Sequence, residues 1–290
     1  LGKTLGLTAN LERRIMRDLQ LFGFDGLPTL TVHHRSRSPL QDLFVRLHNH
    51  LHRCGLLPLS AWGLGRGPYR KANVNDDVLS RTGMDLFFDA FASRVRPQAV
   101  CLEWGSPHYT ARMPSCSTNS TWMFRFAKSG KTAINSRKRT LSADLNQLRE
   151  ADVGGWPRFD LIICNQVFEH ISSPFTAAVA VAQLLAPGGL LFFTAPFMEP
   201  YHRMPGDFFR YTFDGAKTIF ERAGLEVVEQ RRIGNTMLAS AHLLGFGTAD
   251  IDAQTLRRTL IRPIDDPRQP MNRVDEWAFI ETALVARKPR

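Results

Sequence analysis

The chain has few cysteines, and no two of them form a C-x-x-C pair. Only four occur among 290 residues, at Cys54, Cys101, Cys116 and Cys164. Zinc ribbons and small secreted domains held by disulfides both need closely spaced cysteines. The spacing therefore argues against these two classes, and a reducing compartment is the default.

Long apolar runs are also absent. No stretch of about eighteen consecutive apolar residues occurs, which argues against a membrane-spanning helix. The chain opens with Leu1 rather than Met, and residues 1–20 are partly amphipathic and contain arginine, as after removal of a targeting segment. A trimmed chain would look the same. We expect an organellar protein, with the mitochondrial matrix favoured over the cytoplasm.

Acidic residues are in short supply. The chain has 37 Lys and Arg against 27 Asp and Glu, a net charge of +10, which favours a polyanion, an acidic protein or an anionic lipid as partner. Residues 125–139 are rich in cations, and three aromatic residues stand beside or among them. This segment is a candidate contact for RNA or an acidic protein, although aromatic residues that alternate with polar ones also indicate a half-buried strand. For the aromatic residues we favour the strand: Trp122, Phe124 and Phe126.

Residues 1–80 are predicted to form a basic helical extension, and residues 81–290 a separate domain. Apolar residues recur at helical spacing within 8–24 and 40–51, and a third helix is expected from Met84 to Val95, before a proline. His48 and His52 lie four apart in the second of these helices, where a solvated helix face is a simpler explanation than a metal clip. No metal site is predicted.

From Pro97 onward the pattern changes to short apolar strands that alternate with helices. Strands are predicted at 99–105, 121–127, 159–167, 189–196, 225–233 and 279–288. One helix is predicted within 172–189, between a serine cap and a Pro-Gly-Gly stop, and another at 212–223. A strand, a helix and a further strand in this order imply a right-handed parallel crossover. The sequence therefore predicts an α/β fold with a doubly wound, mostly parallel sheet, whose ligands lie beyond the carboxyl ends of the strands.

The segment FDLIICNQVFEHISSPFTAAVAVAQLLAPGGLLFFTAPF resembles the core of class I S-adenosylmethionine (SAM)-dependent methyltransferases, of the type 11-like group that modifies small molecules and lipids. The next segment, PYHRMPGDFFRYTFDGAKTIFERAGLEVVE, is similar to the part of that family after its fifth strand. The resemblance covers about two thirds of the chain. It implies a seven-stranded, Rossmann-like methyltransferase sheet and SAM as cofactor.

The resemblance also implies a set of cofactor-binding residues. They belong to the turn after the first strand, to an acidic position before the fourth strand and to the end of the fourth strand: Glu103, Gly105, Ser106, Tyr109, Asp144, Leu145, Asn165 and Gln166. Asp144 also suits a local turn or cap. Pro107 and Tyr109 replace the usual glycines, and Lys128 and Lys131 stand where a carboxylate would bind the ribose.

A second group of residues is predicted around the acceptor. Glu169 and His170 follow the fourth strand, and Asp207, Arg210 and Tyr211 follow the fifth together with a second histidine, His202. His170 or His202 would act as a general base, and Arg210 would hold an anionic substrate. The alternative is that an Asp207 to Arg210 pair and aromatic packing lock a loop.

The sequence leaves two functions open and does not decide whether the protein is an active enzyme. One is a SAM-dependent methyltransferase that acts on an oxygen, nitrogen or carbon atom of a small or lipid-like molecule. The other is a catalytically inactive, methyltransferase-fold subunit of a large organellar assembly. A third, an RNA methyltransferase, is weakened because no catalytic cysteine motif or N-P-P-Y-type tetrapeptide is present.

Overall fold

The computed structural model describes residues 78–127, 131–202, 206–243, 246–248, 251, 253–264 and 278–290. The chain divides into two compact units, one made of Leu1–Val78 with Leu244–Leu256 and the other of Leu79–Leu243 with Arg257–Arg290. The helices predicted within 8–24 and 40–51, and the His48 and His52 pair, lie outside the described residues. All that follows concerns the second unit.

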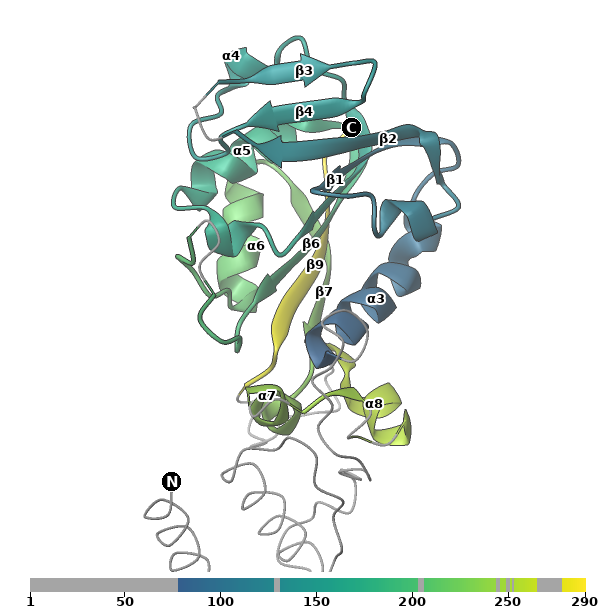
Figure 1. Ribbon diagram of the computed structural model, residues 1–290, viewed down its shortest axis with the longest axis vertical. Helices are drawn as coiled ribbons and strands as arrows, with labels where there is room; N and C mark the ends of the chain where they lie inside the picture. Colours follow the sequence, from purple (N-terminus) through teal and green to yellow (C-terminus); the bar gives the residue numbers. More distant parts are fainter. Residues whose placement is uncertain are drawn as a thin grey trace, which may run out of the picture. The chain divides into compact units, whose positions relative to one another are not determined.

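The described part of this unit contains one nine-stranded sheet in the order β3-β4-β2-β1-β5-β6-β9-β7-β8 (Figure 1). Strands β4, β2, β1, β5 and β6 pair in parallel, and β9 lies antiparallel between β6 and β7. The doubly wound, mostly parallel sheet is therefore confirmed. The strands are β1 (Ala99–Trp104), β2 (Cys116–Phe126), β3 (Ala133–Asn135), β4 (Thr140–Ala143), β5 (Phe159–Asn165), β6 (Leu185–Pro196), β7 (Glu226–Ile233), β8 (Ile261–Pro263) and β9 (Glu281–Arg287).

Two of these strands exceed the seven that were expected. β3 and β8 have three residues each and pair antiparallel at the two edges of the sheet. A strand of three residues is too short to show an alternation of apolar and polar residues. The sequence pattern therefore could not predict them.

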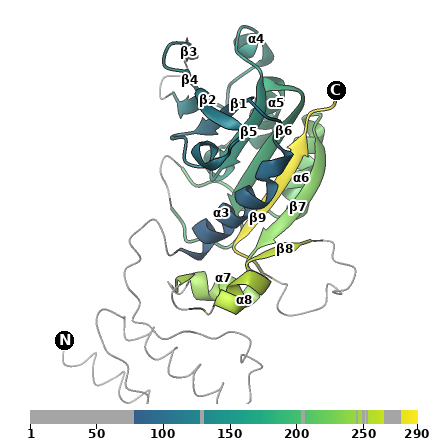
Figure 2. The ribbon, with the colours of Figure 1, turned by 90° about the vertical axis from the view of Figure 1, so that its right-hand side faces the viewer.

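Helices cover both faces of the sheet, as Figures 1 and 2 show. α5 and α6 lie on one face and α3 on the other. The helices are α3 (Leu79–Phe91), α4 (Glu150–Val153), α5 (Pro174–Leu184), α6 (Phe213–Arg222), α7 (Thr236–Leu243) and α8 (Ala253–Thr259). α3 begins five residues before the predicted start, and none of the described helices is long and apolar enough to cross a membrane.

Aromatic residues fill the core on both sides of the sheet. On the α5 and α6 face, the ring of Phe193 lies 5.4 Å from that of Phe168 and 4.9 Å from that of Phe220. On the α3 face, Phe87 and Phe88 each lie 6.3 Å from Phe192. All six rings are almost completely buried. Because Phe192 and Phe193 are neighbours on β6, their side chains point to opposite faces and join both layers to the same strand.

The connection between β1 and β2 is unusually short. These parallel neighbours are joined by residues 105–115, which contain a 3-10 turn, η3 (Thr110–Arg112), and no α-helix. Parallel strands are usually joined by a dozen or more residues that include a helix. A disulfide between Cys101 and Cys116, with Cα atoms 5.9 Å apart, ties the two strands. The spacing of the cysteines did not predict this bond, because only the pairing of β1 with β2 brings them together.

Candidate active site

The turn after β1 leaves open space at the carboxyl edge of the sheet. Gly105 has a φ of +79°, a conformation that side chains disfavour, and its amide donates to the carbonyl of Phe124 over 3.0 Å. Apart from its chain neighbours, no atom of the described residues lies within 4 Å of the point that a Cβ on Gly105 would occupy. This is the kind of turn at which a ligand can approach the backbone.

Glu103 holds the loop that follows this turn. Its Oε1 accepts from the amide of Tyr109 at 2.9 Å, and its Oε2 accepts from the amide and hydroxyl of Thr110 at 2.8 and 2.7 Å. The side chain is buried, which raises the pKa of the carboxyl, while these hydrogen bonds oppose the rise. The structure thus shows a loop-holding role that the sequence motif did not reveal.

Tyr109 packs beneath α3 and away from the space at Gly105. Its ring centroid lies 4.1 Å from that of Phe88, and burial raises the pKa of its hydroxyl. Among the described residues the hydroxyl has no hydrogen-bond partner. Ser106 is exposed beside the turn. Replacement of a loop glycine by Tyr109 therefore fills the gap between α3 and β1 and leaves the turn itself accessible.

Asn165 and Gln166, at the end of β5, are bound to neighbouring strands. The Oδ1 of Asn165 accepts from the hydroxyl of Thr194 on β6 at 2.7 Å. The side-chain amide of Gln166 donates to Oε2 of Glu281 on β9 at 2.7 Å, and its backbone has a φ of +52°. The structure places both residues at the carboxyl edge, where one polar side-chain atom of each is already engaged.

Asp144 and Leu145 form a turn after β4. Oδ1 of Asp144 accepts from the amide and the side chain of Asn146 at 3.0 and 2.9 Å, and Leu145 is fully buried in the core. The Oδ1 of Asn146 in turn accepts from the hydroxyl of Ser172 and the amide of Ser173, both at 2.9 Å. The local-turn alternative for Asp144 is thus present in the structure, where the turn connects β4 to the start of α5.

A second cluster lies after β5 and β6. The chain turns through η4 (Phe168–His170), which buries the Glu169 carboxyl completely. Oε1 of Glu169 lies 3.6 Å from Nε2 of His170 and 4.0 Å from Nε2 of His202. Burial is the largest of the effects that raise the pKa of Glu169 to about 8. The structure therefore brings together the two predicted bases, His170 and His202, with the Glu169 carboxyl buried between them.

The other two predicted catalytic residues hold the loop that carries this cluster. Arg210 binds Asp207 through both guanidinium nitrogens, and this bond lowers the pKa of Asp207 to about 2. The hydroxyl of Tyr211 donates to the carbonyl of Phe168 at 3.0 Å, and the residue is buried. The Asp207 to Arg210 pair that was left as an alternative is thus present, and Arg210 has its charge matched within the loop.

Two acids near this edge, one of them fully buried, were not predicted as site residues. Glu281 is the first residue of β9 and is fully buried, and burial raises its pKa well above the usual value. Oε1 of Glu199 lies 2.8 Å from Nε2 of His242. Glu281 is more than 80 residues away from Glu199 along the chain, so no local motif could group them. A charged residue at the start of an otherwise apolar strand was the only available signal for Glu281.

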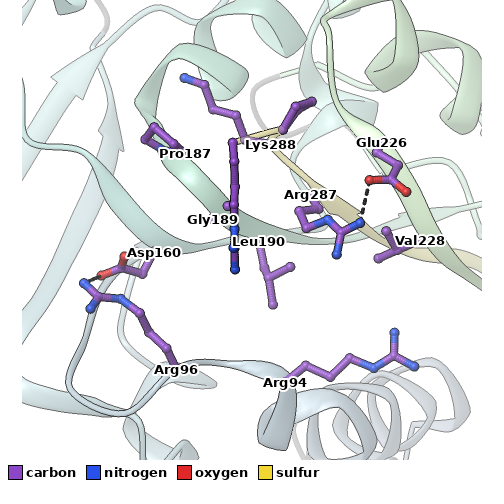
Figure 3. A pocket seen from close by; sticks show the side chains of 13 residues that line it. Arg94, Arg96, Asp160, Pro187, Gly189, Leu190, Glu226, Val228, Arg287 and Lys288 are labelled. Atoms are coloured by element: carbon purple, nitrogen blue, oxygen red, sulfur yellow. Dashed lines mark hydrogen bonds and ion pairs between the residues drawn. The ribbon is translucent and has the colours of Figure 1, made fainter.

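A hollow of about 970 Å³ lies at the opposite edge of the sheet (Figure 3). Two of the five cations that line it are paired with its two carboxylates: Arg96 binds Asp160 and Arg287 binds Glu226, both at 2.7 Å. Ligands of open α/β sheets bind beyond the carboxyl ends of the strands. The carboxyl edge near Gly105 and Glu169 is therefore the better candidate, despite the size of the other hollow.

Three solved structures illustrate the likeness of the chain to known proteins. A putative methyltransferase from Bacillus halodurans is 13% identical, with 71% of this chain and 98% of that chain covered and a TM-score of 0.42. The N-methyltransferase NodS from Bradyrhizobium japonicum, in complex with S-adenosyl-L-homocysteine, is 14% identical, with 74% and 90% covered and a TM-score of 0.41. A SAM-dependent methyltransferase from Mesorhizobium loti is 13% identical, with 72% and 100% covered and a TM-score of 0.43.

Sequence families provide the decisive comparison. No curated protein matches the chain significantly. A family described as methyltransferase domain matches residues 82–230, which is 149 of the 290 residues. The match spans α3 and the sheet from β1 into β7, including the Gly105 turn and the Glu169 cluster. The chain therefore belongs to the methyltransferase domain family.

Proposed function

We propose that the protein is an active SAM-dependent methyltransferase whose acceptor is a small or lipid-like molecule. The observation that carries this proposal is the Gly105 turn, which borders open space at the carboxyl end of β1. Methyl transfer from SAM needs mainly in-line positioning of the acceptor, because the sulfonium is already activated. An accessible cofactor turn is thus the first requirement, and this chain retains it.

The residues around the turn fit one end of SAM better than the other. The amino-acid end of the cofactor would approach the backbone at Gly105 and Ser106, where a Cβ on Gly105 would intrude. The ribose end has no carboxylate of the usual kind, because no Asp or Glu occurs between Glu103 and Asp144. We expect the ribose of the cofactor to make fewer contacts here. The cofactor should therefore bind more weakly than in a methyltransferase whose carboxylate binds both ribose hydroxyls.

Isothermal titration with SAM and with S-adenosylhomocysteine tests the proposal. Gly105→Ala places a methyl group in the cofactor space, so we expect at least about tenfold weaker binding. Gly224→Ala is the matched control, since Gly224 also has a positive φ, of +83°, and an open Cβ position, but follows α6 at the other edge. Both variants carry a similar backbone cost, of about 1–2 kcal/mol. Equal binding by the two variants, or no heat with the wild type at millimolar cofactor, would reject the proposal.

The second candidate function is a non-catalytic docking subunit of a larger, organellar assembly. It is supported by the basic segment 125–139, in which Arg125, Lys131, Arg137 and Lys138 are exposed. Among the described residues these four side chains form none of the ion pairs found elsewhere in the unit. RNA or an acidic protein is the class of partner that such a surface fits.

A pair of charge reversals distinguishes this second candidate. Arg137→Glu with Lys138→Glu is expected to weaken binding to single-stranded RNA or to polyglutamate at least about tenfold, with a steep dependence on salt. Lys217→Glu, on α6, is the control for a charge reversal outside this segment. This candidate would be rejected if the protein binds SAM and if the two reversals leave its binding to RNA and to polyglutamate unchanged.

A further inference from the structure

Glu169 is the most unusual buried group in the described part of the chain. Its side chain is 0% exposed, yet neither carboxylate oxygen has a hydrogen-bond partner among the described residues. A buried polar group without such a partner costs several kcal/mol, and an ionised one costs more. Its Oε1 lies 3.6 Å from Nε2 of His170 and 4.0 Å from Nε2 of His202. Both distances are too long for hydrogen bonds.

Both histidines are oriented by their other ring nitrogen. Nδ1 of His170 contacts the carbonyl oxygen of Gly206, and Nδ1 of His202 lies 3.0 Å from the carbonyl oxygen of Pro200. A carbonyl only accepts, so Nδ1 carries the proton in each neutral ring and Nε2 keeps its lone pair. The two lone pairs are therefore on the side of Glu169. Histidines that bind metals usually donate their second ring nitrogen to a carbonyl or carboxylate in this way.

The ligand atoms are close enough to share one ion. One atom from each of Glu169, His170 and His202 lies within 4.8 Å of the others. Metal bonds of about 2.1 Å to nitrogen and oxygen put tetrahedral ligands about 3.4 Å apart. His170 is already near that distance from Glu169, and His202, whose side chain is 45% exposed, has room to close the remainder.

The surrounding charges favour a cation. Glu199 and Asp207 both act on Glu169 as negative charges, and the one cation among the groups acting on it is Arg210. Arg210 is bound by Asp207 through both of its terminal nitrogens, so these two charges largely cancel and Glu199 is left as the negative charge acting on Glu169. The loop is also held in place, because the amide of Phe208 donates to the carbonyl of Glu169 at 2.7 Å. The cluster is thus both negative and anchored.

We propose that Glu169, His170 and His202 bind a divalent transition-metal ion such as Zn²⁺ or Mn²⁺. Two imidazoles and one carboxylate are a ligand set that first-row metals favour, and three protein ligands leave positions open for water or a ligand oxygen. The ion supplies the missing partner of Glu169. Because the cluster follows β5 and β6 at the carboxyl edge, an oxygen bound to the ion would lie at the edge where methyl transfer is proposed. Metal binding itself does not depend on that function.

The test measures metal binding by the full-length protein without SAM. The protein is stripped with a chelator and titrated with Zn²⁺ and Mn²⁺ by calorimetry, and Co²⁺ is used for its visible absorption, which reports the coordination geometry. The chain has nine histidines, and five of them precede residue 78, so metal can also bind elsewhere in the chain. The measurement that identifies this site is therefore the difference in bound metal between the wild type and a variant. Glu169→Gln retains the side-chain volume, and His202→Asn changes a half-exposed residue that should leave the fold intact.

Each variant is expected to lose one metal equivalent, or to bind it at least about tenfold more weakly. His108→Asn is the matched control, because His108 is similarly exposed, at 48%, and lies outside the cluster. Unchanged stoichiometry and affinity in His202→Asn would overturn the proposal, even if Glu169→Gln failed to fold. A protein that binds the ion but gives no heat with SAM would support the metal site and reject only the proposed enzyme.

Discussion

The side-chain amide of Gln166 donates to Oε2 of Glu281 over 2.7 Å, and so joins the end of β5 to the start of β9 across β6. Oε1 of Glu281 has no hydrogen-bond partner among the described residues, and the carboxyl is fully buried. The contact therefore satisfies only half of the carboxylate. Burial and the neighbouring acids Glu199 and Glu169 favour the protonated form of Glu281 in the folded protein.

Glu281 is expected to make stability fall as pH rises. Burial, Glu199 and Glu169 all raise its pKa well above the usual value, and Arg81 opposes them. The folded state then binds a proton that the unfolded state releases above about pH 4.3, so the stabilisation is complete below that pH and is lost progressively toward the folded pKa. Glu281→Gln removes this loss. The free energy of unfolding of Glu281→Gln, measured from urea unfolding curves, should therefore increase relative to that of the wild type between about pH 4.5 and about pH 8.

Glu221→Gln serves as the control for that experiment, since Glu221 is a half-exposed acid on α6 whose contact with Lys217 is a surface ion pair. Surface pairs of this kind contribute little to stability. A constant difference between Glu281→Gln and wild type across the pH range would contradict the interpretation of Glu281.

The Cys101 to Cys116 disulfide is expected to stabilise the short β1 to β2 connection. The two cysteines are 15 residues apart, and closing a loop of that length removes about 3 kcal/mol of chain entropy from the unfolded state. Cys101→Ser with Cys116→Ser should lower the free energy of unfolding by about that amount. Peptide mapping without reduction should recover the linked pair. Recovery of both cysteines as free thiols after rapid alkylation would show that the bond is absent.

Gly83 is expected to tolerate no side chain. A Cβ at this position in α3 would lie 2.1 Å from Cγ2 of Ile233 on β7, and Ile233 is fully buried. Overpacking of this kind costs about 1–3 kcal/mol and outweighs the better helix propensity of alanine, which is worth about 1 kcal/mol. Gly83→Ala should therefore lower the melting temperature. Gly155→Ala, where the Cβ meets nothing among the described residues, should not.

Thr212 is expected to act as the N-cap of α6. Its hydroxyl accepts from the amide of Gly215 at 3.1 Å, at the point where the loop from Asp207 enters the helix. Thr212→Ala should destabilise the protein by about 1 kcal/mol, and Thr212→Ser should restore most of that loss. Chemical denaturation measures both. Equal stability of the alanine and serine variants would argue against a cap.

Much of the fold could be read from short-range patterns. The α5 segment begins with a serine and a proline and ends before Pro-Gly-Gly, and the structure confirms a helix from Pro174 to Leu184. The apolar runs that flank it are β5 and β6, paired in parallel. Such elements are predictable because their signals lie within a few residues of one another.

The candidate site was only partly predictable. Sequence motifs placed Gly105, Asn165 and His170 after the correct strands, because the ends of parallel strands meet at one edge. They did not reveal that the Glu103 carboxylate accepts hydrogen bonds from its own loop, or that the side chain of Gln166 donates to Glu281. Those contacts depend on loop geometry and on strands more than 100 residues apart.

The sequence by itself determined the family, the mostly parallel character of the sheet and the absence of acidic residues between Glu103 and Asp144. These features follow from the local spacing of residue types and from composition. Only the tertiary structure decided that Cys101 meets Cys116, and that Glu169 is buried between His170 and His202. The physical reason is that a covalent bond or a shared ion depends on distances in space, and these are set by strand register and by the loop that follows β6.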